Sequence, residues 1–543
     1  RDLHSFPTRR SSDLDRYSGE KMLSNKTIKI FGPPGTGKTY TLLNRLDKWF
    51  NKGVQPREIA YLSFTNKAVN EARHRANKKF PGCDDEDLGN FRTIHSFCRK
   101  FRKQVPVLDP EIDMVEFAQN LGMAKPAYEN YNGVNVFNDW SLRVYDKSRN
   151  KLIKPEQQFV EEQFKRATLP KFQLIYQQYE LFKQDHRVDF TDMITHFIEK
   201  EEAPYLKVLI IDEAQDLTPL QWKMVYKLAA RAQKIYIAGD DDQAIFEWNG
   251  ANVKDYINFP GRNYILKQSH RIPKVVHDFS GYISDMIRPR VVKEFLPSGK
   301  DGHIRTHSSF VDIVDMISQS DGDWLILGRT QEIVRELEDL ARNAGVFFQN
   351  TKGKTSFDIN KWNAIKSWNK LMNKGLVSKD EAGILYTYVN EIAFGWRSIE
   401  SKRWMNISSS DKMDLDFLRV FAGLVADPGP WQQVFNRNFP EKDKFYFEKI
   451  LENKINLDLS SRVTIDTIHS IKGGEADHVC IYEKANWPAH FGHKVGVARS
   501  SEARVWYVGI TRARETLHIL RTYHEYFFPL ARLYNQFIKD KLW

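Results

Sequence analysis

The sequence has little cysteine and no long apolar run. Its three cysteines, Cys83, Cys98 and Cys480, are odd in number and lie far apart in a chain of 543 residues. Disulfide frameworks and cysteine-based metal clusters need several cysteines at short spacing, so both are excluded and a reducing compartment is expected. A membrane-spanning helix is also excluded, because no stretch of about 18 uncharged apolar residues occurs. We predict a cytoplasmic protein that does not bind membranes.

The N-terminal segment lacks the apolar stretch of a secretion signal. It begins RDLHSFPTRRSSDL, which is polar and contains arginine. Residues 1–20 show no hydrophobic periodicity. We predict that they form a disordered tail, or that they are foreign to the functional protein.

Acidic residues are fewer than basic ones, 70 against 81, and the formal net charge is +11. An excess of positive charge favours a polyanionic partner such as nucleic acid. Many basic proteins bind no nucleic acid, so charge alone leaves this question open. The chain length predicts about three to four domains.

Short apolar runs alternate with amphipathic helices in two regions of the chain. A helix is predicted at residues 39–50, and strands of the first region at residues 27–31, 59–64, 207–211 and 234–238. Strands of the second region are predicted at residues 302–306, 324–327, 463–465, 479–482 and 517–520. This alternation predicts an α/β fold with parallel sheets that helices cover on both faces.

A mostly helical stretch interrupts each of these regions. We predict a first parallel-sheet domain at residues 21–100 and 204–263, with an insertion at residues 101–203. A second such domain is predicted at residues 264–350 and 461–543, with an insertion at residues 351–460.

A glycine-rich segment directly after the first strand predicts a phosphate site. The pattern G-x-x-x-x-G-K-[ST] is matched by Gly32, Pro33, Pro34, Gly35, Thr36, Gly37, Lys38 and Thr39. The glycines let backbone N–H groups turn toward phosphate oxygens, and the following helix adds its positive dipole. Lys38 is expected to reach the β and γ phosphates, and the Thr39 hydroxyl to ligate Mg²⁺. The alternative is a glycine-rich turn, which the flanking strand and helix disfavour.

An acidic pair follows a second apolar strand, at residues 208–211. Ligands bind at the carboxyl ends of parallel strands, where Asp212 and Glu213 are expected. We predict that Asp212 holds Mg²⁺ and that Glu213 polarises the attacking water as a general base. Such a pair is weak evidence alone, and strong evidence beside the glycine loop.

A series of segments in the same order resembles the motifs of the UvrD/Rep-type superfamily 1 (SF1A) DNA helicases. They are LSFTNKAVNEARHRA (62–76), TIHSFC (93–98), DFTDMI (189–194), IIDEAQDLTPLQW (210–222), AGDDDQAIFEWNGA (238–251), LKQSHRIP (266–273), VTIDTIHSIKGGEADHV (463–479) and YVGITRARETL (507–517). The resemblance implies two RecA-like P-loop domains that use ATP and Mg²⁺. It also implies a compact member of the family, such as a phage or mobile element would carry.

The resemblance also assigns residues of the nucleotide site. Gln243 matches the position that senses the γ-phosphate, and Arg271 and Arg512 match two arginine fingers. Arginine suits this role because its planar fork spreads over the equatorial oxygens of the transferred phosphoryl group. Together with Lys38, Asp212 and Glu213, these three residues form the predicted catalytic set.

Three further positions are expected to contact the nucleotide. Glu475 matches a residue on the sugar side. Tyr40 stands where an arginine is common in the family, and His270 where a tyrosine stacks on the base. Either ring offers a stacking surface.

The predicted DNA contacts are of two kinds. Phe64, Phe246 and Trp248 match positions that stack or pocket single-stranded bases, which any sequence permits. The polar positions that hold the phosphate backbone are matched by Thr65, Asn66, Thr93, His95, Thr467 and His469. The expected partners are single-stranded and duplex-junction DNA, with unidentified replication or repair proteins.

The resemblance implies a helicase that translocates 3′→5′ by hinge closure of the two sheets. Gln243 and Trp248 lie in one loop, which links phosphate state to base grip. Two alternatives stay open: a translocase that removes bound proteins without strand separation, and a DNA-binding regulatory ATPase. An RNA substrate is less favoured, because no 2′-hydroxyl reader is recognisable.

The sequence departs from the family in three further places. Residues 1–31 contain no glutamine, although a glutamine-bearing motif that reads adenine usually precedes the glycine loop. The insertion at residues 351–460 is shorter than usual. The long C-terminal extension is expected to be absent, since the sequence stops at residue 543. Adenine specificity, processivity and protein partners are left open.

Overall fold

The structure is a computed structural model, and its chain divides into two compact units. The first unit contains Arg1–Thr306 and Ile468–Trp543, and the second contains His307–Thr467. The structure describes residues 21–63, 66–109, 111–126, 128–131, 134–162, 168–184, 187–389, 408, 411–436, 438–486 and 496–542. The predicted tail at residues 1–20 and the predicted DNA contacts Phe64 and Thr65 lie outside these residues.

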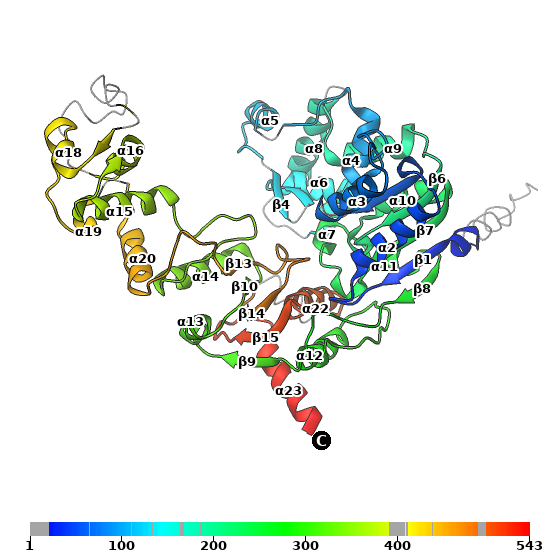
Figure 1. The fold of residues 1–543 in the computed structure, drawn as a ribbon. Helices are drawn as coiled ribbons and strands as arrows, with labels where there is room; N and C mark the ends of the chain where they lie inside the picture. Colours follow the sequence, from blue (N-terminus) through cyan, green and yellow to red (C-terminus); the bar gives the residue numbers. More distant parts are fainter. Residues whose placement is uncertain are drawn as a thin grey trace, which may run out of the picture. The chain divides into compact units, whose positions relative to one another are not determined.

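The first unit contains a six-stranded parallel sheet with the strand order β3-β2-β6-β7-β1-β8 (Figure 1). Its strands are β1 (Thr27–Phe31), β2 (Ile59–Ser63), β3 (Phe91–Thr93), β6 (Leu206–Ile211), β7 (Ala232–Gly239) and β8 (Arg262–Ile265). The sequence predicts the four inner strands. It misses the edge strands β3 and β8, which are short and carry polar, partly exposed residues.

The edge strand β8 affects the predicted domain boundary between residues 263 and 264. Ile265 pairs with Phe31 of β1, so the chain is still part of the first sheet at this point. The predicted boundary therefore falls inside a strand. Since β8 has the sequence RNYI, its apolar content is too low to mark it as a strand.

Helices cover both faces of this sheet, as the apolar strands predict. Alternate residues of one strand point to opposite faces: Leu209 belongs to one core cluster and Ile210 to the other. The first face packs against α4 (Ile94–Arg99), α9 (Phe190–Lys200) and α10 (Pro219–Ala230). The second face packs against α2 (Lys38–Asn51) and α3 (Asn66–Lys79). Full burial of one such side chain contributes about 1.5–3 kcal/mol, which stabilises the strand ends that carry the site.

The predicted first insertion is mainly helical. It contains α5 (Asp113–Leu121), α6 (Trp140–Lys151), α7 (Pro155–Glu161), α8 (Leu169–Lys183) and the antiparallel pair β4 (Tyr128–Tyr131) and β5 (Val134–Phe137). A buried ion-pair cluster joins α6 and α8 to the start of α9. Lys183 Nζ lies 2.7 Å from Asp189 Oδ2 and 2.8 Å from Asp192 Oδ2, and Arg149 Nη1 lies 2.7 Å from Asp189 Oδ2.

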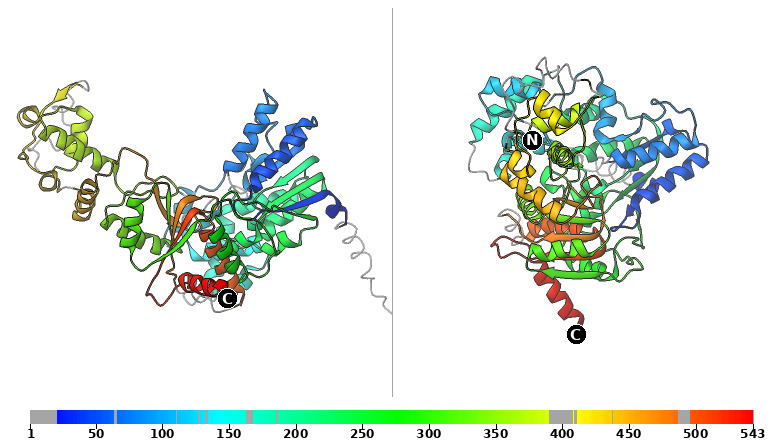
Figure 2. Two further views of the ribbon diagram at one scale, coloured as in Figure 1. Left: turned by 60° about the horizontal axis from the view of Figure 1, so that its bottom comes forward. Right: turned by 60° about the vertical axis from the view of Figure 1, so that its left-hand side comes forward.

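The rest of the first unit contains a second set of parallel strands. Strand β14 (Ala476–Tyr482) pairs in parallel with β15 (Ala513–Leu520). The helices α12 (Lys274–Ser284), α22 (Gly496–Ile510) and α23 (Leu530–Leu542) complete this part of the chain (Figure 2). The helix α11 (Val253–Asn258) lies between β7 and β8 of the first sheet. The helix α12 packs against α22 and α23.

The second unit contains the parallel pair β10 (Trp324–Gly328) and β13 (Val463–Thr467). Strand β9 (His303–His307) precedes it in the chain, and its helices begin with α13 (Phe310–Gln319) and α14 (Gln331–Asn343). An aromatic core that includes Trp362, Trp368 and Trp431 follows. Its helices are α15 (Ile359–Met372), α16 (Lys379–Tyr386), α18 (Leu415–Phe421), α19 (Trp431–Val434) and α20 (Glu441–Glu452), with a two-residue ladder of β11 (Val377–Ser378) and β12 (Lys412–Met413). Among the helices of the described residues, none has the length and apolarity needed to cross a membrane.

Candidate nucleotide and DNA site

The glycine loop lies between β1 and α2, at the carboxyl end of the central strands. Gly35 and Gly37 have φ values of 73° and 76°, a left-handed conformation that glycine adopts without strain. A Cβ added to Gly35 would lie 2.5 Å from the Cβ of Arg271. The loop is therefore packed directly against the LKQSHRIP segment.

Two hydrogen bonds fasten these segments together. The Ser269 hydroxyl donates to the carbonyl of Pro34 at 2.9 Å, and the backbone N–H of His270 donates to the carbonyl of Gly35 at 2.9 Å. Both groups come from the chain that follows β8. Because β8 extends beside β1, the sheet itself brings this segment to the glycine loop.

Lys38 and Thr39 begin α2 and face the loop. The Lys38 ammonium donates to the carbonyl of Gly32 at 2.9 Å, which holds the charge over the loop. The Thr39 hydroxyl donates to Asp212 Oδ2 at 2.9 Å. A hydroxyl and a carboxylate in this arrangement are the protein ligands that Mg²⁺ takes in P-loop proteins, so these residues fit the ion.

Asp212 and Glu213 differ in their protonation behaviour, although they are neighbours in the chain. Burial, together with the charge of Glu213, raises the pKa of Asp212 to about 7. Burial also acts on Glu213, but the cations Lys38 and Lys472 outweigh it and lower the pKa of Glu213. Glu213 is thus held as a carboxylate, the form that a general base needs.

The backbone at Glu213 is strained. Its φ of 54° lies in the left-handed region, which costs about 1–3 kcal/mol for a residue other than glycine. Gln215 Nε2 holds the side chain by donating to Glu213 Oε2 at 2.7 Å, and also donates to Asp216 Oδ2 at 2.9 Å. Strain of this kind persists where surrounding contacts fix the conformation, as they do here.

The predicted γ-phosphate sensor contacts one of the predicted arginine fingers. Arg512 Nη2 donates to Gln243 Oε1 at 2.8 Å, while Gln243 Nε2 donates to Asp240 Oδ2 at 2.6 Å. Arg512 is almost fully buried. Burial and the nearby charge of Arg271 lower the pKa of Arg512 to about 9. Arg271 itself pairs with Glu475.

One cavity of about 530 Å³ brings most of the predicted nucleotide residues together. Its lining includes five of the six predicted catalytic residues, and Asp212 adjoins it through Thr39. The lining residues are Pro34, Gly35, Thr36, Gly37, Lys38, Thr39, Tyr40, Glu213, Gln243, His270, Arg271, Lys472, Gly473, Glu475 and Arg512. Gly32 and Pro33 lie at the start of the loop, outside the lining. No group of three or more His, Cys, Asp or Glu that could hold a metal occurs in the described part of the chain.

The predicted base-contacting rings form a cluster. The ring of Phe246 lies 6.2 Å from that of Trp248 and 6.4 Å from that of His469, and the rings of Trp248 and His469 are 6.3 Å apart. Phe246 is only 1% exposed, whereas Trp248 is partly exposed. Trp248 therefore presents the more accessible ring, with Phe246 beneath it.

Three other predicted DNA residues of the described chain, Asn66, Thr93 and His95, lie outside this cluster. Thr93 caps α4, where its hydroxyl accepts a hydrogen bond from the N–H of Ser96 at 3.4 Å. His95 packs edge-on to Phe190 at 5.6 Å, and burial lowers its pKa to about 4, so it is neutral. Asn66 is exposed at the start of α3. Thr467 ends β13 in the second unit.

The sequence interpretation missed the residues that hold the loop between Asp240 and Glu247. Lys293 Nζ lies 2.5 Å from Asp241 Oδ1 and 2.9 Å from Asp242 Oδ2. Arg504 of α22 lies 2.7 Å from Glu247 Oε1 and donates to the carbonyl of Asp241 at 3.0 Å. The three consecutive aspartates were the sequence signal for these cations, because adjacent carboxylates that become buried require positive partners.

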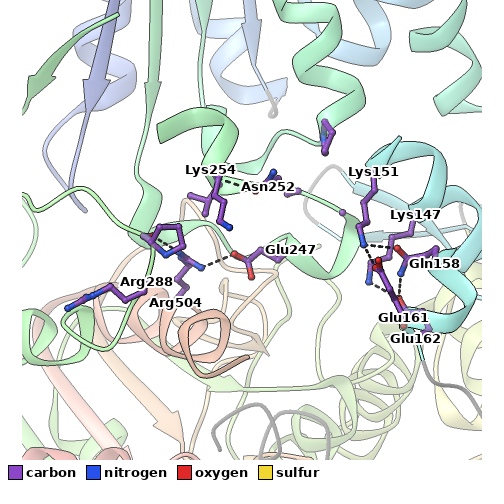
Figure 3. A pocket seen from close by; sticks show the side chains of 15 residues that line it. Lys147, Lys151, Gln158, Glu161, Glu162, Glu247, Asn252, Lys254, Arg288 and Arg504 are labelled. Carbon is purple, nitrogen blue, oxygen red and sulfur yellow. Dashed lines mark hydrogen bonds and ion pairs between the residues drawn. The ribbon is translucent and has the colours of Figure 1, made fainter. Parts of the chain in front are cut away.

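Arg504 and Glu247 also line a second cavity, of about 570 Å³ (Figure 3). The opposite wall carries Lys147 and Lys151 of α6, which pair with Glu162 and Glu161. Most charges of this cavity are therefore neutralised by partners within it. We interpret it as a set of structural ion pairs behind the Trp248 loop.

A glycine loop between a parallel strand and a helix, with an acidic pair at the carboxyl end of another strand of the same sheet, defines a P-loop nucleoside triphosphatase. Residues 18–262 match the UvrD/REP helicase N-terminal domain. Residues 438–525 match the UvrD-like helicase C-terminal domain. The chain belongs to the UvrD/Rep family of superfamily 1 helicases.

Similar proteins carry helicase names at low sequence identity. The chain is 22% identical over 613 residues to a probable DNA helicase II homolog of Mycoplasma pneumoniae, covering 94% of this chain and 84% of that protein. It is 23% identical over 498 residues to the ATP-dependent DNA helicase PcrA of Bacillus subtilis, covering 82% and 67%. With PcrA of Staphylococcus aureus (strain Mu50) the identity is 24% over 392 residues, and the match spans 52% of that protein.

Proposed function

We propose that this protein is an ATP-dependent DNA helicase that moves 3′→5′ along single-stranded DNA and separates duplex strands. The observation that carries the proposal is the shared cavity of Lys38, Glu213, Gln243, Arg271 and Arg512. These residues come from five separate segments, and one of the segments continues into the ring cluster around Trp248. The names of the similar proteins and the order of the motifs support DNA as the substrate and 3′→5′ as the polarity.

The nucleotide would bind with its phosphates on the glycine loop. Lys38 would balance the charge of the β and γ phosphates, and Arg271 and Arg512, which line the same cavity, would contact the γ-phosphate. Thr39 and Asp212 would hold Mg²⁺, which would supply further positive charge for the phosphate oxygens. Glu213, kept as a carboxylate by Lys38 and Lys472, would orient and deprotonate the attacking water.

Movement would follow from the contacts of Gln243. Its side chain joins Asp240 to Arg512. A γ-phosphate that binds Gln243 or Arg512 would therefore change the position of this loop. Trp248 lies five residues further along the same loop. A change at the phosphate would then alter the hold of Trp248 on a base, and repeated cycles would advance the protein by alternating grip.

The experiment that tests this proposal uses duplexes with a 3′ or a 5′ single-stranded tail, with and without ATP and Mg²⁺. We expect unwinding of the 3′-tailed duplex only, and only with ATP. Unwinding of the 5′-tailed duplex would contradict the polarity. If neither duplex is unwound while single-stranded DNA stimulates hydrolysis, the protein is a translocase. Hydrolysis without DNA stimulation would indicate a regulatory ATPase.

A further inference from the structure

Lys472, in the segment HSIKGGE, contacts three parts of the site that are distant in sequence. Its side chain is only 7% exposed. The ammonium pairs with the carboxylate of Asp216 and donates to the carbonyl of Gln243 at 2.7 Å. It also lies 5.1 Å from the centre of the Phe246 ring. One cation thus joins the acidic strand end, the γ-phosphate sensor and the ring cluster.

The contact with Asp216 connects Lys472 to the general base. Asp216 is 2% exposed, and its Oδ1 has no hydrogen-bond partner among the described residues. Gln215 Nε2 donates both to Asp216 and to Glu213, so one amide group connects the two carboxylates. A buried carboxylate of this kind needs a cation, which Lys472 supplies.

The other two contacts connect Lys472 to the DNA side. The side chain of Gln243 is held by Asp240 and Arg512, and Lys472 holds the carbonyl of the same residue. Phe246 follows three residues later and packs beside Trp248. His469, a member of the same ring cluster, precedes Lys472 by one turn, and its carbonyl accepts from the N–H of Lys472 at 3.3 Å.

We propose that Lys472 is a positioning residue that couples the occupancy of the nucleotide cavity to the grip of the Phe246–Trp248–His469 ring cluster on DNA. The inference rests on the proposed function. A nucleotide that displaces Gln243 or Arg512 moves the carbonyl of Gln243, and Lys472 passes this displacement to the ring beneath Trp248. Without the ammonium, the loop and the ring cluster respond to the nucleotide independently.

The test measures how strongly the nucleotide changes DNA affinity. The dissociation constant of a fluorescent oligodeoxythymidylate is determined by anisotropy, with and without Mg²⁺ and a non-hydrolysable ATP analogue. The ratio of the two constants is the coupling factor, for which about 5–150-fold is typical of coupled sites. Turnover does not enter this ratio, so a slower enzyme does not by itself change it.

Three variants separate coupling from structural support. Lys472→Met leaves Asp216 without its cation and is expected to destabilise the protein. The double variant Asp216→Asn/Lys472→Met removes both charges, so it carries the test if the single variant does not fold. We expect its coupling factor to fall to about twofold or less, against the typical range for coupled sites. Lys472→Arg keeps the charge, and we expect it to restore most of the coupling.

A matched control is Lys254→Met, which removes an exposed lysine at the wall of the cavity behind the Trp248 loop (Figure 3). Its coupling factor should equal that of the unaltered protein. A folded double variant with unaltered coupling would overturn the role of Lys472 and leave it a structural ion pair. Absence of ATP hydrolysis in the unaltered protein would instead contradict the proposed function, so the two failures are distinguishable.

Discussion

The two ends of the loop from Asp240 to Trp248 are built in different ways. At the phosphate end, Gln243 is fixed by short polar contacts to Asp240 and Arg512. At the DNA end, Trp248 is partly exposed and contacts the rings of Phe246 and His469 at more than 6 Å between centres. Polar contacts are directional, whereas ring packing tolerates small shifts. The phosphate end thus suits recognition of one geometry, and the DNA end suits bases of any sequence.

The largest expected effect comes from a substitution in the phosphate site that leaves the DNA end of the loop unchanged. Lys38→Ala should lower the rate of ATP hydrolysis by at least about 100–1,000-fold, because a preorganised charge at the transferring phosphoryl group is lost. Binding of single-stranded DNA in the absence of nucleotide should change by less than about threefold, since Lys38 lies outside the ring cluster. Steady-state hydrolysis and anisotropy measure the two quantities. Retained turnover would contradict the assignment of the phosphate site.

A second prediction concerns Arg512, which also lines the nucleotide cavity. Arg512→Ala should lower kcat by about 1,000-fold, as expected for an arginine finger. Glu515→Ala is the matched control, because Glu515 is three residues away in β15, pairs with Lys300 at 2.5 Å and does not line the cavity. We expect the control to retain kcat within about twofold, as is usual for a partly exposed ion pair. Equal losses in both variants would indicate a general disturbance of β15.

The third prediction concerns a substitution at the DNA end of the loop. Trp248→Ala should weaken binding of single-stranded DNA by about 1–3 kcal/mol, the contribution of one stacked base. Duplex unwinding should fall in parallel, while hydrolysis without DNA persists. The control is Tyr523→Ala, which removes an aromatic side chain that is 88% exposed. Unaltered DNA affinity in the Trp248 variant would exclude the stacking role.

The smallest effect concerns the close packing of the glycine loop. Gly35→Ala and Gly53→Ala both place a side chain at positive φ, with values of 73° and 81°, and each should cost about 1 kcal/mol of unfolding free energy. Only at Gly35 does the new Cβ meet other atoms, 2.5 Å from Arg271, whereas nothing lies within 4 Å at Gly53. Gly35→Ala should therefore also raise KM for ATP. Thermal unfolding measures the destabilisation that both variants share. Steady-state kinetics measures the rise in KM for ATP that is expected for Gly35→Ala alone.

Much of the first sheet was predictable from its sequence. Residues 27–31 were predicted as a strand and form β1, and the helix predicted at residues 39–50 is α2 (Lys38–Asn51). The apolar runs at β6 and β7 were sufficient because these strands are buried on both faces. The short edge strands β3 and β8 gave no such signal. Their pairing depends on the strand beside them.

Individual side-chain roles were less predictable. His95 has the residue type of a polar DNA contact, but the structure packs it against Phe190 and burial makes it neutral. Lys472 lies in a recognised motif, but its role could not be predicted, because a single lysine in a sequence is most often a solvated surface residue. Its role follows from three partners that are far away in the chain.

The proposed phosphate-binding loop of this protein can be read from one contiguous stretch of residues. Residues 32–39 are contiguous, and their glycines, lysine and threonine specify a loop whose backbone conformation is local. The residues that face this loop come together only in the folded chain. Arg271 reaches the loop because β8 pairs with β1, and Arg512 and Lys472 meet Gln243 through contacts that span more than 200 residues. Local backbone preferences act over a few residues, whereas such contacts exist only once the sheets and their cores have formed.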